Sequence, residues 1–213
     1  MLTKLNPKKA LIWRILHRDN IPWVLDNGLH CANSAVKAPA WTDIGNPELI
    51  SKRAERPVPI DPRGFLGDYI PFYFTPLSPM MMNVLTGRGG VSKRKHEEII
   101  ILASSLPKIN SMGTHFVFTD SHAYYMWANF YNDLNDLHNI DWQIIQNRNF
   151  NRDADDPVKF ERYQAEALIH RHLPVEGLLG MVCYNDDVKA DLEHEVQKRK
   201  LSLSVHVRTG LYF

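Results

Sequence analysis

A carboxylate inside an apolar strand pattern is the clearest chemical signal in this sequence. Glu166 lies in the otherwise apolar segment 165–169, shortly after a helix start signal at Asp156 and Pro157. Burial of an ionised carboxylate costs free energy unless the group is paired or used. Glu166 therefore either forms a structural ion pair with an arginine or faces a cleft, where its charge stabilises a cation.

His17 and Arg53 stand near the ends of predicted elements, where side chains are free to do chemistry. His17 ends an apolar segment that starts at Leu11, and its alternative role is that of a hydrogen-bonded structural histidine. Arg53 lies near the end of a helix that Asn46 and Pro47 begin, and its alternative role is that of a solvated surface arginine. Residue type and position leave both alternatives open in each case.

Three shorter motifs indicate structure rather than chemistry. The glycine-rich residues 87–90 have Ser92 where a dinucleotide fingerprint needs its third glycine, so we interpret 87–95 as a mobile basic loop. Residues 120–122 (Asp, Ser, His) hold the letters of a hydrolase triad without the Gly-x-Ser-x-Gly turn that positions a nucleophile. His170 and His172 share one face of a predicted strand but have no third ligand at a characteristic spacing, so we expect no metal site.

The composition is that of a globular protein without a large net charge. The chain has 213 residues, 44% of them hydrophobic, and 25 Lys and Arg against 24 Asp and Glu leave a net charge of +1. This length favours a single domain, and the charge balance restricts any polyanion binding to a local surface. Cys31 and Cys183 are too few for a disulfide framework, and no apolar run reaches about 18 residues. We therefore expect one soluble, cytoplasmic domain that does not enter a membrane.

Helices inserted irregularly between roughly eight short strands predict an α+β fold with a mixed or antiparallel sheet. The expected strands are residues 11–17, 69–74, 98–103, 116–119, 164–170, 178–184 and 201–208. The expected helices are residues 21–27, 47–53, 80–86, 121–137, 142–146 and 186–200, with a further short helix starting at 157. Pro71 has no backbone N–H, which predicts an edge strand or a bulge at 69–74.

Four segments together closely resemble the DarT family of bacterial toxins, which ADP-ribosylate DNA. They are His17 with Asn20, the aromatic residues 68–76 leading to Met80, residues 116–122, and residues 164–166. The segments follow one another in the order that the family shows, and the resemblance extends from about Leu11 to Phe213.

The resemblance implies a mono-ADP-ribosyltransferase fold, in which two small sheets with inserted helices surround an NAD cleft. Its three signature positions match His17 on the first strand, Tyr73 on an aromatic strand and Glu166 on a later strand. Family members modify a base of single-stranded DNA, thymine in one branch and guanine in the other, and a macrodomain antitoxin (DarG) removes the mark. We accordingly expect a monomer that uses NAD and no metal, favours thymine in single-stranded DNA, and has a macrodomain antitoxin as its partner.

The resemblance also assigns roles to individual residues. Glu166 and Arg53 match the catalytic positions. The expected cofactor-binding residues are Arg14, Ile15, Leu16, His17, Asn20, Cys31, Arg53 and Tyr73. The expected substrate-binding residues are Met80, His122, Arg148 and Arg152, with His122 at the start of a loop to Glu166 that meets the substrate.

The chemistry of ADP-ribosyl transfer supports these residue types independently. Cleavage of the bond from nicotinamide to ribose produces an oxocarbenium-like cation, which a carboxylate such as Glu166 stabilises. The main chain at the end of the first strand can bond the nicotinamide carboxamide, and Tyr73 can stack on the ring. Because a guanidinium stays protonated in proteins, Arg53 is an awkward base, and we assign it stabilisation of charge on the attacking base and on the pyrophosphate. Local phosphate and stacking contacts are available from Lys93, Arg94, Lys95, Arg148, Arg152, Tyr124, Tyr125, Trp127 and Tyr131.

Two rival functions fit the same sequence. One is an ADP-ribosyltransferase that acts on RNA or protein, and the other is a non-catalytic nucleic-acid binding module in which Glu166 is a structural ion-pair partner. NAD turnover separates the enzymes from the binding module, and the identity of the modified molecule separates the enzymes from each other.

Overall fold

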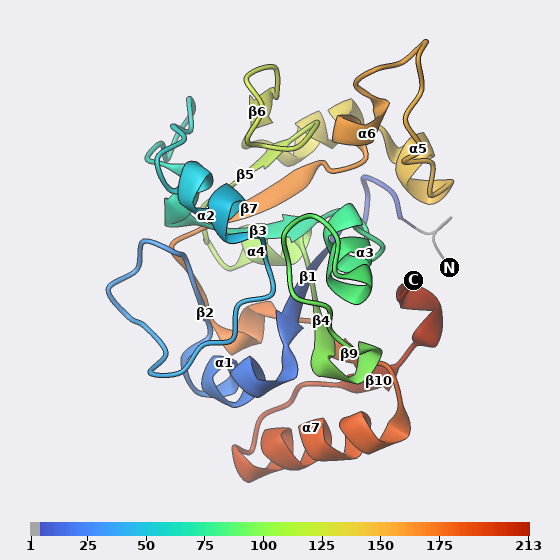
Figure 1. Ribbon diagram of the computed structural model, residues 1–213. Coiled ribbons are helices and arrows are strands. Elements are labelled where there is room, and N and C mark those ends of the chain that lie inside the picture. The colour runs from blue at the N-terminus through green and yellow to red at the C-terminus, as the bar shows by residue number, and fades with distance from the viewer. Residues whose placement is uncertain (1–4) are drawn as a thin grey trace.

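A mixed eight-stranded sheet forms the centre of the molecule (Figure 1). The computed structural model describes residues 5–213, and within them the strands follow the order β10-β9-β4-β1-β3-β7-β5-β6. These strands are β1 (Leu11–His17), β3 (Tyr69–Tyr73), β4 (Ile99–Ser105), β5 (Phe116–Thr119), β6 (Phe130–Tyr131), β7 (Glu166–His170), β9 (Gly180–Cys183) and β10 (Val205–Val207). A second sheet pairs β2 (Leu29–His30) with β8 (His172–Leu173). The α+β class and the mixed sheet are confirmed, because β10 and β9 are parallel and the other neighbours in the large sheet are antiparallel.

The large sheet consists of two four-stranded halves that meet at a single residue pair. β1 and β3 pair only at Trp13 and Tyr73, whereas β1 pairs with β4, and β3 pairs with β7, along their whole lengths. Beyond Trp13 and Tyr73 the two central strands diverge, so one half carries β1 and the other carries β3 and β7. The two sheets implied by the family resemblance are therefore present as the halves of one sheet, and the gap between them provides room for a ligand.

Pro71 lies on an interior strand, so the expectation of an edge strand or a bulge is wrong. Arg171 N donates to Asp68 O, and the alternation of hydrogen bonds along this antiparallel pair turns the nitrogen and carbonyl of Pro71 away from β7. On that side β1 has already diverged, and the Arg14 guanidinium donates to the Pro71 carbonyl at 2.8 Å. Pro71 is tolerated there because no strand requires the N–H that it lacks.

Capping side chains fix the helices that border this gap. Asn46 accepts a hydrogen bond from Leu49 N at 2.9 Å, and Ser78 accepts one from Met81 N at 3.2 Å, each directly before a proline at the first helical position. The helices of the described residues are α1 (Ile21–Asn27), α2 (Pro47–Ala54), α3 (Pro79–Thr86), α4 (Leu106–Ser111), α5 (Trp142–Gln146), α6 (Lys159–Arg162) and α7 (Asp186–Lys198). The predicted starts of α2 and α3 are confirmed, whereas α4 was not expected from the sequence.

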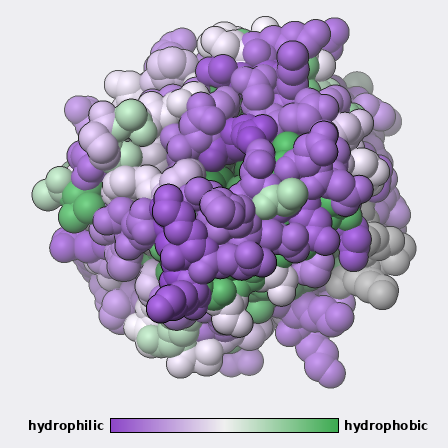
Figure 2. Space-filling model, turned by 90° about the horizontal axis from the view of Figure 1, so that it is seen from below, coloured by the Kyte–Doolittle hydropathy of each residue, from purple (hydrophilic) through white to green (hydrophobic). Residues whose placement is uncertain are grey.

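The helices α1 and α7 lie together beneath the sheet in Figure 1. The apolar side of α7 buries Val188, Leu192 and Val196, which repeat at helical spacing and belong to the main hydrophobic core. The face of the molecule seen from below is mainly hydrophilic (Figure 2). These helices therefore support the half of the sheet that carries β1 and leave the gap between β1 and β3 open on the other side.

The segment 121–137 is not the long helix that its residues suggested. It forms turns, then β6, and then a 3₁₀ helix at Leu134–Asn139. The Asp120 carboxylate accepts hydrogen bonds from Asn129 N at 3.1 Å and Asn129 Nδ2 at 2.7 Å and closes the turn segment into a loop. Such contacts between side chain and backbone compete with helix formation.

Two smaller expectations also differ from the structure. The last strand is limited to Val205–Val207, because the residues before it connect α7 to the sheet without strand pairing. His170 and His172 belong to different strands rather than to one strand face, since Arg171 between them has a left-handed φ of 62°.

Candidate active site

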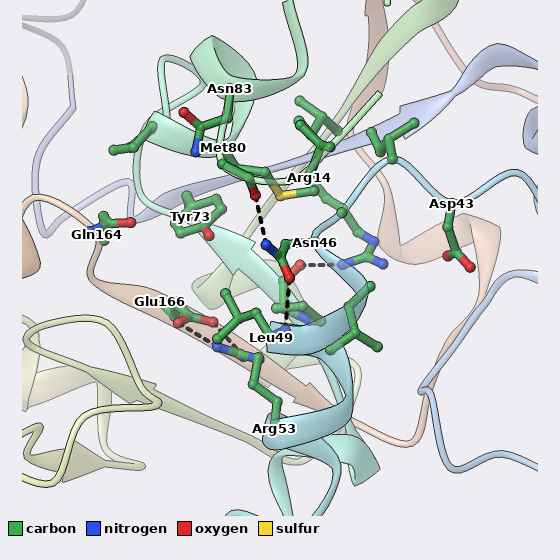
Figure 3. Close-up of a pocket in the computed structure, with 18 of the residues that line it drawn as sticks. Arg14, Asp43, Asn46, Leu49, Arg53, Tyr73, Met80, Asn83, Gln164 and Glu166 are labelled. Atoms are coloured by element: carbon green, nitrogen blue, oxygen red, sulfur yellow. Dashed lines mark hydrogen bonds and ion pairs between the residues drawn. The ribbon is translucent and has the colours of Figure 1, made fainter. Parts of the chain in front are cut away.

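A cavity of about 280 Å³ lies where the two halves of the sheet diverge (Figure 3). Strands β1, β3 and β7 and helices α2 and α3 form its walls. Tyr163 fixes two of these walls relative to each other, since its buried hydroxyl donates to Leu77 O at 2.9 Å. That bond ties the segment that enters β7 to the segment that enters α3.

Glu166 and Arg53 form a bidentate ion pair across this cavity (Figure 3). Arg53 Nη1 donates to Glu166 Oε1 at 2.9 Å and Arg53 Nη2 donates to Glu166 Oε2 at 2.7 Å. The side chain of Glu166 is 1% exposed and that of Arg53 is 13% exposed. The sequence offered either an ion pair with arginine or a carboxylate in a cleft, and the structure shows both in one arrangement.

Two further groups contact the Glu166 carboxylate, and one of them donates a hydrogen bond to it. Ala123 N donates to Oε1 at 3.0 Å, and the ring of His122 packs against the same oxygen, with Nδ1 at 3.4 Å while it accepts from Tyr124 N at 3.3 Å. Burial acts to raise the pKa of Glu166, but the Arg53 guanidinium outweighs it and holds that pKa below its ordinary value. Burial lowers the pKa of His122. At neutral pH the cavity therefore contains an ionised carboxylate beside a neutral imidazole.

The ion pair predicts a specific loss of stability in acid. Because the pKa of Glu166 is depressed in the folded state, its contribution is present above the ordinary carboxyl pKa and is lost as the pH falls through the folded-state pKa. At neutral pH we expect Glu166→Gln to lower the free energy of unfolding by about 3 kcal/mol. Denaturant unfolding of both proteins at a series of pH values should show this difference shrinking below pH 4.5. A difference that stays constant into strong acid would contradict the assigned charge state.

Tyr73 and the main chain of β1 form the wall opposite α2. Burial raises the pKa of Tyr73, so its phenol stays protonated and its ring provides an aromatic surface. Ala10 O accepts from Leu106 N, and alternation along the strand then directs the main-chain groups of Ile15 away from β4. These groups face the gap, where β3 does not pair with them, and are available to a ligand with a donor and an acceptor.

The side chains of His17 and Asn20 lie outside this cavity. His17 Nδ1 accepts from Asp19 N at 3.2 Å, so Nε2 carries the hydrogen and donates to Glu98 at 3.3 Å. The buried Asn20 amide makes two hydrogen bonds of 2.8 Å with the main chain of Thr42, which lines the cavity. Asn20 therefore contributes by fixing the wall segment that contains Thr42.

Loosening that wall should weaken cofactor binding more than turnover. We expect Asn20→Ala to remove two buried hydrogen bonds, to lower stability by about 2 kcal/mol and to raise the KM for NAD several-fold with kcat nearly unchanged. Steady-state kinetics beside Asn110→Ala, which alters an exposed asparagine on α4, checks this expectation. An unchanged KM with a reduced kcat would mean that Asn20 acts on the reaction and not on the wall.

Of five other site residues expected from the sequence, three line a cavity and two do not. Met80 and His122 line the cavity, whereas Cys31 lines a neighbouring cavity of about 380 Å³. Arg148 and Arg152 line neither cavity. The Arg148 side chain bonds Gly210 O at 3.5 Å, and the Arg152 guanidinium lies over the Phe160 ring, 5.7 Å from its centre.

Several polar residues of the site were not singled out in the sequence. Gln164 lines the cavity from the same segment as Glu166, and the spacing of two residues along a strand was a signal for it. Asn46 caps α2 and also donates to Gly89 O at 2.6 Å, so it joins α2 to the basic loop. No sequence signal indicates this second bond. Four more residues line the cavity and were not singled out in the sequence, namely Trp41, Thr42, Asp43 and Asn83.

The described residues contain neither a cluster of metal ligands nor a helix suited to a membrane. Within 5–213, no three His, Cys, Asp or Glu side chains are grouped so that they could hold a metal ion. No helix in this part of the chain combines the length and the apolar character that crossing a membrane requires.

Comparison with known proteins gives a consistent result. Residues 13–213 match the model of the family described as "ssDNA thymidine ADP-ribosyltransferase, DarT". A curated DNA ADP-ribosyl transferase of Escherichia coli O127:H6 (strain E2348/69 / EPEC) is 60% identical over 209 residues, which cover 98% of this chain and 96% of that protein.

Two solved structures share the fold over nearly the whole chain. Thermus sp. 2.9 DarT in complex with ADP-ribosylated ssDNA has a TM-score of 0.89 and 27% identity, covering 97% of this chain and 98% of that one. The same protein in complex with NAD+ has a TM-score of 0.83 at 27% identity, covering 97% and 99%. The family match, the identity to a curated relative and the shared fold show that this chain belongs to the DarT family and is an NAD-dependent DNA ADP-ribosyltransferase.

Proposed function

We propose that the protein transfers ADP-ribose from NAD to thymine in single-stranded DNA and releases nicotinamide. The observation that carries this proposal is the ionised Glu166, held by Arg53 at the wall of a cavity between the two halves of the sheet. The description of the matched family as a thymidine-directed enzyme supports the choice of base, and the Thermus complex with ADP-ribosylated ssDNA supports a single strand.

The lining of the two cavities suits the two ends of NAD. The first cavity offers the main chain of Ile15 to a carboxamide and the ring of Tyr73 to an aromatic heterocycle, beside the Glu166 carboxylate. The second cavity is lined by apolar and aromatic groups that include Trp23 and Cys31, which suits an adenosine. We therefore place the nicotinamide riboside end in the first cavity and the adenosine end in the second.

Glu166 lowers the barrier by stabilising positive charge. NAD supplies a ribose whose bond to nicotinamide breaks with oxocarbenium character. Glu166 is fixed by Arg53 and Ala123 N before the reaction begins, so its charge acts on the transition state without reorganisation. Its near-complete burial strengthens this effect, because less water screens the charge.

Arg53 acts as a cation in the proposed reaction and not as a proton acceptor. Burial acts to lower the pKa of Arg53, but the Glu166 carboxylate raises it above the ordinary value, so the guanidinium stays protonated. A cation at this position stabilises the negative charge that develops on a thymine when its N3–H proton leaves to water. Arg53 thus serves the attacking base and the carboxylate at the same time.

An exposed aromatic loop offers a surface for the DNA strand beside the cavity. The rings of Tyr125 and Trp127 stack at 4.7 Å with an interplanar angle of 10°, and Met126 next to them is 78% exposed. The same loop begins at His122 and Ala123, which contact Glu166. Bases of a single strand stack on aromatic side chains, and here such a surface continues directly from the carboxylate.

Oligonucleotides matched in all but one position test the choice of substrate. Each would carry a single thymine, guanine, cytosine or adenine at the centre of an otherwise fixed strand, beside the paired duplex and an RNA of the same sequence. We expect an NAD-dependent mass increase and equimolar nicotinamide with the thymine single strand, and little with the duplex, because extrusion of a paired base costs a few kcal/mol. Modification of the guanine strand alone, or of RNA in preference to DNA, would assign a different target.

The family resemblance also carries the biological setting. We propose that the protein is a cytoplasmic, monomeric toxin whose mark on DNA is removed by a cognate macrodomain antitoxin. Incubation of the modified oligonucleotide with a DarG-type macrodomain should restore the unmodified mass, and a stable adduct would contradict the pairing.

A further inference from the structure

Arg14 projects from β1 to the wall that the two cavities share. Figure 3 shows its guanidinium in the cavity, on the side where Asp43 lies. Nη1 donates to the Pro71 carbonyl at 2.8 Å, and Nε is enclosed without a hydrogen-bond partner among the described residues. The side chain is therefore anchored at the split between β1 and β3 and retains unused donor capacity at the junction of the cavities.

The charge of Arg14 is not balanced by an ion pair. Arg53 is held by a bidentate carboxylate, whereas the Arg14 guanidinium pairs with no carboxylate of residues 5–213. Asp43 lines both cavities and attracts Arg14 from beyond ion-pair distance. Burial lowers the pKa of Arg14 to about 10, which still leaves it charged at neutral pH. A charged, enclosed guanidinium with an unsatisfied donor is costly unless a ligand completes it.

We propose that the Arg14 side chain binds the pyrophosphate of NAD at the junction of the two cavities. This inference rests on the proposed placement of the nicotinamide riboside and adenosine ends. The pyrophosphate is the group that links the two nucleosides, so it lies between them wherever they bind. A guanidinium also presents parallel donors that match two oxygens of a phosphate. Arg53 is less suited to this role than its position on α2 suggested, because its charge is already balanced by Glu166, which accepts one N–H from each of its Nη atoms.

The position of Arg14 gives the contact a function in the reaction. Its anchor on Pro71 belongs to β3, the strand that also carries Tyr73, and its own strand carries the main chain of Ile15. A pyrophosphate bound to Arg14 would therefore be held at a fixed position relative to Tyr73 and to the main chain of Ile15. Arg14 thereby positions the ribose against Glu166, separately from the main-chain role that the same segment of β1 plays.

A comparison of ligands with and without phosphate tests this contact. Calorimetry would measure the affinities of ADP and adenosine for the wild type, Arg14→Met, Arg14→Lys and the control Arg18→Met, which alters an arginine paired with Asp191 outside both cavities. We expect the wild type to prefer ADP over adenosine and Arg14→Met to reduce that preference by at least about tenfold, with adenosine affinity preserved. Arg14→Lys should restore part of the preference because it retains the charge, and Arg18→Met should behave as the wild type.

The ratio of ADP affinity to adenosine affinity also distinguishes a pyrophosphate contact from a purely structural role of Arg14. Equal losses of ADP and adenosine affinity in Arg14→Met would show that the residue only supports the cavity, and an unchanged ratio, or no preference in the wild type, would overturn the proposal. Modification of DNA by the wild type is measured apart from these affinities. A protein that modifies DNA but shows no effect at Arg14 refutes this inference alone, whereas an inactive protein with an Arg14-dependent ratio refutes the proposed reaction alone.

Discussion

Glu166→Gln is expected to lower the rate of ADP-ribosyl transfer at saturating NAD by a factor of about 10² to 10³. Glutamine retains the size of the side chain and an oxygen for Ala123 N, so the change removes mainly the negative charge. That charge matters most when the ribose becomes cationic, and NAD affinity should therefore change much less than turnover. Single-turnover modification of an oligonucleotide, with calorimetry of NAD binding, measures the two effects separately.

The matched control is Glu176→Gln, which removes an exposed carboxylate in the 3₁₀ helix Val175–Gly177, where it lines neither cavity. Thermal unfolding should show that Glu166→Gln remains folded at the assay temperature despite its loss of the ion pair. If the folded variant modifies DNA at nearly the wild-type rate, stabilisation of the ribose cation by Glu166 is excluded. If NAD binding and turnover fall together, the carboxylate serves ground-state binding instead.

Arg53→Ala is expected to reduce turnover with DNA by a factor of about 10² or more while NAD affinity changes less than about tenfold. The cation is needed only when negative charge appears on the attacking base. Arg53→Lys retains a charge but loses the planar fork that holds both oxygens of Glu166, so we expect incomplete rescue. Oligonucleotide modification and NAD calorimetry on the wild type and both variants test whether turnover falls from the wild type to Arg53→Lys and further to Arg53→Ala.

The pH dependence of Arg53→Ala provides a second readout. Without the guanidinium, His122 and Ala123 N alone oppose the effect of burial, so we expect the pKa of Glu166 to rise in Arg53→Ala. The pH below which activity falls should therefore move upward in Arg53→Ala and much less in Arg53→Lys. A normal turnover at saturating NAD with weak NAD binding would instead identify Arg53 as a clamp for the cofactor.

Local signals in the sequence were sufficient for the elements that border the site. Asn46 and Ser78, each followed by proline, predicted the starts of α2 and α3, because a cap satisfies donors within its own helix turn. The apolar segment from Leu11 to His17 predicted β1 over the same residues. These features depend on neighbours in sequence, which the chain specifies directly.

Local sequence signals could not predict the features that depend on tertiary contacts. Arg53 and Glu166 are 113 residues apart, so residue types alone left open whether each was paired or free. The turn at 121–129 depends on the bonds of Asp120 to Asn129, which override the helical preference of the residues between. Pro71 predicts an edge strand because it has no backbone N–H. It is tolerated on an interior strand here because β1 has diverged and requires no N–H from it.

In the proposed reaction, Glu166 assists the transfer of ADP-ribose from NAD to a thymine base. The most direct measurement is mass spectrometry of nucleosides after digestion of a single-stranded oligonucleotide with one thymine, incubated with NAD and either wild type or Glu166→Gln. We expect ADP-ribosylated thymidine with the wild type, and a yield at early times that is lower by a factor of about 10² or more with the variant. Unmodified thymidine with the wild type, or equal yields from the two proteins, would contradict the proposed reaction.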